Sequence, residues 1–142
     1  YAIEIAKFYP ELTVIQKSCP MWVPLVENNE FDNAGGDYYI NKYIQEILEE
    51  DNKIDTLVLA CTHYPILEKK IRKCMPKHIR LVSQGELVAT KLEGYLVRHP
   101  EINNRLSKNS SLKVLTTENN ISFDAVASNF YKEEIKSISV KL

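Results

Sequence analysis

Apolar residues follow two different spacings along this chain, one typical of helices and one typical of buried strands. Residues 36–50 carry apolar side chains in pairs that recur four residues apart. This spacing forms one apolar stripe and predicts an amphipathic helix with Asp37 near its N-terminus. The stripe consists of Tyr39, Ile40, Tyr43, Ile44, Ile47 and Leu48. Residues 55–61 are instead almost continuously apolar, as expected of a strand that is buried on both faces of a parallel sheet.

The shorter segments continue this alternation of strands and helices. Pro20 and Pro24 disfavour a helix interior or a central strand, so residues 19–32 are predicted to form a loop. The polar residues 100–111 are also predicted to form a loop. Further strands are predicted within 11–18 and at 79–83, 112–117 and 135–142, and further helices at 2–8, 65–75, 85–99 and 122–131. This order of elements predicts an α/β fold with a mainly parallel sheet and flanking helices.

Composition narrows the class of protein. The 142 residues, 44% of them hydrophobic, are enough for a real core. The net charge of -1 gives no basic surface for nucleic acid, and the lack of any run of 18 apolar residues argues against a membrane span. Three cysteines without CxxC spacing argue against a disulfide framework and a structural zinc site, and they fit a reducing cytoplasm. We therefore expect a cytoplasmic protein that binds neither nucleic acid nor a membrane.

The stretch DTLVLACTHYPIL, residues 55–67, places three chemically active side chains where the predicted strand ends. Ligands of open α/β sheets bind beyond the carboxyl ends of the strands, and Cys61 lies at such an end. Backbone N–H groups near the next helix start favour a bound carboxylate, and the same field lowers the pKa of a cysteine thiol. His63 can exchange protons near neutral pH, and Thr62 can donate to a bound carboxylate. These residues predict proton transfer or nucleophilic attack on a small acid.

Taken singly, the same residues have simpler interpretations. A cysteine at a strand end is usually a packing residue, and a histidine near a helix start is more often a cap or a surface residue than a catalyst. The complete Cys-Thr-His-Tyr-Pro string is more specific than any of its members.

That string carries a resemblance to a known family. LVLACTHYPIL resembles the second cysteine motif of glutamate racemases, with Ala60 where the family usually has glycine. SCPMWVPLVEN, residues 18–28, is similar to the family's Cys-Pro-x-x-Val-Pro-Leu-Val-Glu segment, and residues 112–131 resemble its closing strand and helix. The resemblance extends over essentially the whole chain.

Family members are nearly twice this length and use two cysteines, one for each face of the substrate's α-carbon. The motif of the first cysteine, an Asn-Thr-containing loop that follows an Asp-Ser pair, is not found in these residues. Cys19 matches the Cys-Pro segment and Cys74 has no Asn-Thr neighbour, so we expect both to be structural. The chain thus resembles the C-terminal half of a racemase. That explains why it opens on Tyr1 inside a predicted helix, and it implies that the chain is inactive alone.

The resemblance implies that L- and D-glutamate are interconverted by proton transfer between two thiols, without a cofactor or a metal, to supply D-glutamate for peptidoglycan. Cys61 would be the second thiol, which deprotonates the D-isomer and protonates the carbanion formed from the L-isomer. His63 would assist these transfers, and Thr62 would bind the amino acid head group. Glu27 matches a family glutamate near the substrate's amino group; the alternative for Glu27 is a solvated loop residue.

The family also implies an organisation into two similar α/β lobes with the substrate between them. Residues 1–83 would form most of the second lobe, incomplete at its N-terminus, and residues 84–142 would return to the first. Without their sheet partners, the returning strands would expose edges and apolar faces. We therefore expect a chain that is marginally stable alone and forms a homo-oligomer, a dimer, in the bacterial cytoplasm.

Two alternatives remain. The nearest is aspartate racemase or another member of the two-cysteine superfamily, although those proteins tend to have an acidic residue where this chain has His63. The other is a non-catalytic truncated chain that keeps the second lobe and only associates with itself. Racemisation of L- and D-glutamate distinguishes these alternatives.

Overall fold

The computed structural model describes residues 1–141, and the chain divides into two compact units. Unit 1 is Tyr1–Ser83 and unit 2 is Gln84–Leu142. Each unit combines helices with a parallel sheet of two strands, which confirms the predicted α/β class and its mainly parallel pairing. The assignment of the two units to lobes of a racemase stays a prediction. Within residues 1–141, no helix is both long and apolar enough to cross a membrane.

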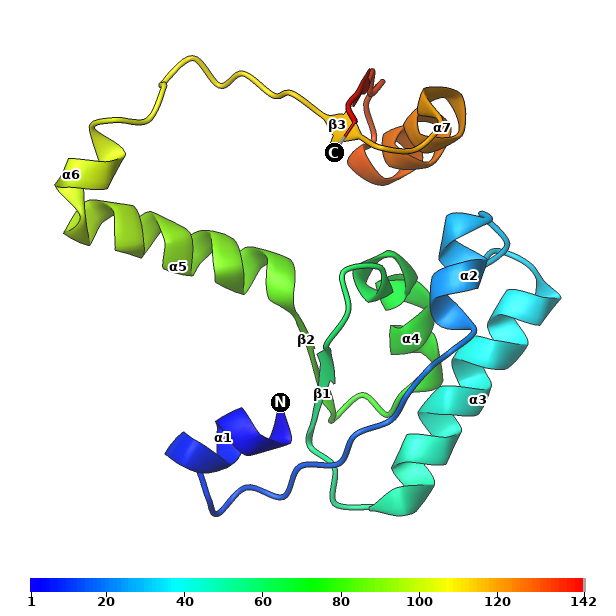
Figure 1. The fold of residues 1–142 in the computed structure, drawn as a ribbon. Coiled ribbons are helices and arrows are strands. Elements are labelled where there is room, and N and C mark those ends of the chain that lie inside the picture. The colour runs from blue at the N-terminus through cyan, green and yellow to red at the C-terminus, as the bar shows by residue number, and fades with distance from the viewer. Residues whose placement is uncertain (142) are drawn as a thin grey trace. The chain divides into compact units, whose positions relative to one another are not determined.

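Unit 1 places helices beside its two-stranded sheet (Figure 1). Its elements are α1 (Ala2–Phe8), α2 (Trp22–Glu27), α3 (Ala34–Glu50), β1 (Thr56–Leu59), the 3₁₀ helix η1 (Tyr64–Leu67), α4 (Glu68–Cys74) and β2 (Arg80–Ser83). β1 and β2 run parallel, with Thr56 opposite Arg80 and Leu59 opposite Ser83. Both strands therefore end at the same edge of the sheet, and Cys61 follows just beyond β1.

The amphipathic helix predicted from residue 36 is α3, and its cap lengthens it at the N-terminus. The Asn33 side chain accepts a hydrogen bond from the N–H of Gly36 over 2.9 Å, which satisfies a donor that the first turn leaves unpaired. Gly36 also packs against the backbone of Phe31, where an added Cβ would lie 2.4 Å from the carbonyl oxygen. The buried residues of α3 are Gly36, Ile40, Tyr43, Ile44 and Ile47, so the predicted stripe faces the core.

β1 is covered on one face, and the prediction that this strand is buried on both faces is wrong. Leu59 is 2% exposed, whereas Val58 is 45% exposed. Helices α3 and α4 pack against each other, and Figure 1 shows both on the same side of β1. Their apolar faces can therefore cover only the alternate side chains that point toward them. The helices packed on a strand, rather than its own apolar run, decide whether its second face is buried.

The loop predicted for residues 19–32 contains the helix α2. Pro24 is the third residue of this helix. Because the first four N–H groups of a helix have no acceptor within the helix, the missing N–H of Pro24 removes no hydrogen bond. The loop prediction is wrong here because it treated Pro24 as an interior residue.

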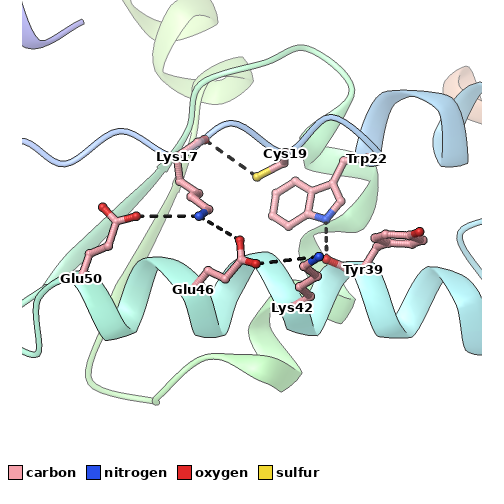
Figure 2. A network of polar contacts seen from close by, with 7 residues as sticks. All are labelled: Lys17, Cys19, Trp22, Tyr39, Lys42, Glu46 and Glu50. Carbon is pink, nitrogen blue, oxygen red and sulfur yellow. Dashed lines mark hydrogen bonds and ion pairs between the residues drawn. The ribbon is translucent and has the colours of Figure 1, made fainter.

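The strand predicted within residues 11–18 is also absent from the structure, although residues 13–19 belong to no helix. Contacts with α3 hold this segment (Figure 2). Lys17 Nζ lies 2.8 Å from the carboxylate of Glu46 and 3.8 Å from that of Glu50. The Trp22 indole N–H donates to the Tyr39 carbonyl over 3.3 Å. These contacts attach the segment to α3 and leave it without a strand partner.

Unit 2 contains α5 (Gln84–Arg98), α6 (Pro100–Asn103), β3 (Leu115–Thr116), α7 (Asn120–Tyr131) and β4 (Ile138–Ser139). The helices predicted at 85–99 and 122–131 are confirmed, whereas α6 corrects the loop prediction for residues 100–111. Proline fits the first position of α6 because its fixed φ suits a helix start. β3 and β4 pair in parallel over two residues each, which is shorter than predicted. Leu142, the last residue of the predicted final strand, lies outside the described residues.

Candidate active site

Three residues form the bend between β1 and η1. Cys61, Thr62 and His63 follow the end of β1 after one residue, Ala60, and the Tyr64 N–H then donates to the Cys61 carbonyl over 3.3 Å. The first part of the predicted helix 65–75 is the 3₁₀ helix η1, and the α-helix begins only at Glu68. Because a helix dipole acts mainly over its first turn, the helix field at Cys61 is weaker than the sequence predicted.

His63 has a contact at each of its ring nitrogens. Its Nδ1 lies 3.9 Å from the Cys61 sulfur and 3.5 Å from the Thr62 hydroxyl oxygen. Its Nε2 lies 3.2 Å from the Glu27 carboxylate. A proton on Nε2 is donated to Glu27, and Nδ1 is then free to accept a proton from the Cys61 thiol. The contact with Glu27 thus favours the tautomer that carries its proton on Nε2.

Glu27 reaches this bend because aromatic side chains lock α2 against η1. Trp22 packs edge-on against Tyr64 with ring centroids 4.8 Å apart, and against Tyr43 at 6.0 Å. Trp22 is buried, whereas Glu27 at the far end of α2 is exposed. The side chain of Glu27 is 56% exposed, so its pairing with His63 contributes little to stability. Its effect is to orient the histidine.

The other two cysteines occupy different surroundings. Cys19 is buried, and this burial raises the pKa of its thiol to about 11. Burial also raises the pKa of the neighbouring Tyr64 hydroxyl to about 12. Cys74, the last residue of α4, is partly buried, which raises the pKa of its thiol as well. Cys61 is the cysteine of this chain that lies beside a histidine at a strand end.

All four predicted site residues, Cys61, Thr62, His63 and Glu27, come together in the structure. Glu27 was predictable only through its motif, because the packing of Trp22 that carries it to His63 leaves no signal in the spacing. Tyr64 was not among the residues predicted from the sequence to belong to the site. Tyr64 packs edge-on against Trp22, and so holds the bend against α2.

The chain is similar to glutamate racemases over most of its length. It is 31% identical to the glutamate racemase of Lactiplantibacillus plantarum over 121 residues, which are 85% of this chain and 44% of that protein. It is also 31% identical to the glutamate racemase of Persephonella marina over 141 residues, 96% of this chain and 50% of that protein. The chain therefore spans about half the length of the curated relatives it matches. No family model matches it.

Solved structures give the same result. The crystal structure of the glutamate racemase isoform RacE1 from Bacillus anthracis superposes with a TM-score of 0.85 at 30% identity, covering 100% of this chain and 52% of that one. The glutamate racemase of Francisella tularensis, solved in complex with D-glutamate, shares the fold with a TM-score of 0.80 at 24% identity, covering 100% of this chain and 52% of that one. The chain is a homologue of the C-terminal half of glutamate racemases.

Proposed function

We propose that residues 1–142 supply one of the two catalytic thiols of a glutamate racemase, and that Cys61 is this thiol. The observation that carries the proposal is the row of contacts from Glu27 through His63 to Cys61 at the carboxyl end of β1. A base oriented by a third group and placed beside a thiol is the arrangement that activates cysteine for proton transfer. The Francisella tularensis racemase binds D-glutamate, which supports glutamate as the substrate.

In the proposed reaction, the Cys61 thiolate removes the α-proton of D-glutamate, and the electron pair of the C–H bond remains on carbon. A second thiol, outside the motifs of this chain, then donates a proton to the opposite face, which gives L-glutamate. Cys61 passes its proton to Nδ1 of His63, whose imidazolium is stabilised by Glu27. Thr62 donates from its hydroxyl to the substrate carboxylate, and Glu27 also attracts the substrate ammonium group. The reverse reaction uses the same groups in the opposite order.

The proposal extends to the setting of the enzyme. The two thiols carry out the proton transfers without a cofactor, and the product D-glutamate serves peptidoglycan synthesis in the bacterial cytoplasm. Unit 1 forms most of the second lobe and unit 2 returns to the first. The complete enzyme is a homo-oligomer, a dimer. Residues 1–142 alone are inactive or nearly so, because their motifs approach one face of the α-carbon.

A chimaera tests this proposal directly. Residues 1–142 replace the matching half of the Lactiplantibacillus plantarum racemase, and racemisation is followed by circular dichroism together with deuterium uptake from solvent. We expect the chimaera to racemise glutamate, and Cys61→Ser to lower the rate by roughly 10²–10⁴-fold, the range that a positioned acid or base contributes. Cys74→Ser is the matched control and should retain the rate. His63→Gln should reduce deuterium uptake from D-glutamate more than uptake from L-glutamate.

Several outcomes would overturn the proposal. A Cys61→Ser chimaera with full activity would remove Cys61 from the reaction. Activity that disappears with removal of pyridoxal phosphate or metal ions, and returns with either, would contradict the thiol mechanism. Faster racemisation of aspartate than of glutamate would favour the aspartate racemase alternative. Racemisation by residues 1–142 alone at the rate of the chimaera would make Cys19 or Cys74 the partner thiol.

A further inference from the structure

Glu27 meets His63 with a side chain that has little support of its own. The side chain is 56% exposed, and among residues 1–141 its carboxylate has one ion-pair partner, the His63 ring nitrogen at 3.2 Å. An exposed pair of this kind holds its members weakly, because water and side-chain freedom compete with the contact. The position of the backbone that carries Glu27 therefore decides how often its carboxylate reaches the imidazole.

That backbone position is fixed by the way α2 ends, directly after Glu27. The Asn29 N–H donates to the Val26 carbonyl over 3.1 Å. The Glu30 N–H donates to the Leu25 carbonyl over 2.8 Å. Asn29 itself adopts the left-handed conformation, with φ of 55°. Together these features form a Schellman motif, which pairs carbonyl groups that a helix end otherwise leaves without a donor.

Two asparagine side chains add to this helix end. The Asn28 side-chain amide donates over 2.8 Å to the Pro24 carbonyl, which also accepts from the Asn28 N–H over 3.0 Å. The Asn33 amide donates to the Glu30 carboxylate over 2.6 Å, and Asn33 is also the N-cap of α3. We call residues 28–33 the α2 corner. It joins the end of α2 to the start of a helix that is held in the core.

The geometry of the α2 corner depends on the residue at position 29. Glycine reaches the left-handed region without steric cost, and asparagine adopts it more readily than other residues that carry a side chain. A β-branched residue such as valine strongly avoids this region. A residue that leaves the left-handed conformation must rotate the backbone two residues after Glu27. That rotation breaks the two hydrogen bonds of the Schellman motif and turns the Glu27 carboxylate away from His63.

We propose that Asn29 is a positioning residue of the racemase reaction, which acts through Glu27 on His63. The inference rests on the proposed function, in which His63 takes the proton of Cys61 and Glu27 stabilises the imidazolium. When the helix end is displaced, the imidazole loses its orienting partner, and removal of the α-proton from D-glutamate slows. The second thiol acts on the opposite face of the α-carbon, so its own proton transfer should change less.

A graded series at position 29 of the chimaera tests the inference. The substitutions are ranked by their tolerance of the left-handed region. We expect Asn29→Gly to keep the racemisation rate within about twofold, because glycine preserves the Schellman motif. Asn29→Ala should lower the rate by roughly threefold and Asn29→Val by about tenfold, less than the roughly hundredfold that a misplacement of about 1 Å can cause. Deuterium uptake from D-glutamate should fall more than uptake from L-glutamate.

A double substitution separates positioning from a general loss of stability. Glu27→Gln removes the charge through which Asn29 acts, so Asn29→Val added to it should lower the rate by no more than about a further twofold. Lys132→Val is the matched control, because Lys132 ends α7 in the same left-handed conformation, with φ of 64°. This control should leave the ratio of deuterium uptake from the two isomers unchanged.

A second measurement needs no catalysis. Residues 1–142 are prepared with ¹⁵N-labelled histidine, and the ring nitrogen resonances of His63 report its tautomer and its hydrogen bonds. Glu27→Gln and Asn29→Val should shift these resonances in the same direction, whereas Asn29→Gly should leave them as in the parent chain. Circular dichroism verifies that each variant keeps its helices. If Asn29→Val does not fold, the comparison of Asn29→Ala with Asn29→Gly replaces it.

Three results would overturn the inference. The first is an equal rate for folded chimaeras that carry glycine and valine at position 29. The second is a double variant in which the losses from Glu27→Gln and Asn29→Val multiply in full, since the two residues would then act independently. The third is a shift of the His63 resonances by Glu27→Gln but not by Asn29→Val. A fully active Cys61→Ser chimaera would instead contradict the proposed function, and the His63 resonances would still decide whether Asn29 places Glu27.

Discussion

The two units of this chain use their apolar residues in opposite ways. Residues 1–141 contain fourteen buried apolar side chains, and all of them except Ile135 lie in unit 1. Unit 2 has helices of similar length, yet α5 buries none of its residues although Leu87, Val88, Leu92 and Tyr95 recur along it. An apolar stripe on a helix therefore predicts where a core would form, and a packing partner decides whether it does.

The largest expected difference between the units concerns their apolar side chains. Ile44 in α3 is 1% exposed, so Ile44→Ala should lower the free energy of unfolding by about 2–5 kcal/mol through lost burial and a cavity. Leu92 in α5 is 53% exposed. Leu92→Ala should therefore change the free energy of unfolding by no more than about 0.5 kcal/mol. Urea titrations followed by circular dichroism measure both. Equal losses of unfolding free energy in the two variants would show that α5 is packed in solution, and the difference between the units would then not hold.

Glycines in the two long helices sharpen the same comparison. Gly36→Ala in α3 should destabilise unit 1 by about 1–3 kcal/mol, because the added Cβ meets the rigid backbone of Phe31. A Cβ added at Gly94 of α5 would lie 3.3 Å from the end of the Arg98 side chain, and that side chain can move. Gly94→Ala should therefore stabilise the helical state of α5 by up to about 1 kcal/mol and increase helicity. Thermal unfolding with far-ultraviolet detection compares the pair; a stabilising Gly36→Ala would contradict the close packing.

Removal of an N-cap side chain should change stability less than the core and glycine substitutions do. Asn33 caps α3, and its side chain accepts from Gly36; Asn119 caps α7, and its side chain accepts from Ile121. Asn33→Ala should lower the stability of unit 1 by about 1 kcal/mol. Asn119→Ala should leave the unfolding of unit 1 unchanged and only increase exchange of the first amides of α7. Measurement of amide exchange in both variants separates these effects, and a shared loss would mean that the two units unfold together.

Replacing Cys19 should have the smallest effect on stability at neutral pH, and this effect should grow at alkaline pH. The pKa of its thiol is about 11 in the folded chain and lower, near the ordinary 9.0, when burial is lost. Below pH 9 both states keep the proton, so stability is complete. Between pH 9 and about 11 the unfolded state releases its proton first, and stability falls. Cys19→Ala should flatten this decline in urea titrations, although Tyr64 and Lys17 also titrate there and leave some slope.

The features that could be predicted from the sequence are those that depend on residues close together in the chain. The stripe of α3 and the strand end at Cys61 were predictable because each is encoded within a few residues. The contact between Glu27 and His63 was not, since it depends on Trp22 packing between Tyr43 and Tyr64. The exposed face of β1 was missed for a related reason: an apolar run records which faces can be buried, whereas the packed helices determine which face is. α2 was missed because the position of a proline within a helix matters more than its presence.

The packing of Trp22 also has an optical consequence. This is the single tryptophan of the chain, it is 3% exposed, and its indole N–H is hydrogen-bonded to the Tyr39 carbonyl. Its ring lies edge-on to Tyr64, one residue after His63. Tryptophan emission shifts to longer wavelength when the indole becomes exposed to water, so the native fluorescence of this protein reports the seating of α2 on η1. An unlabelled sample can thus reveal, in real time, events that separate α2 from η1 and so carry Glu27 away from His63.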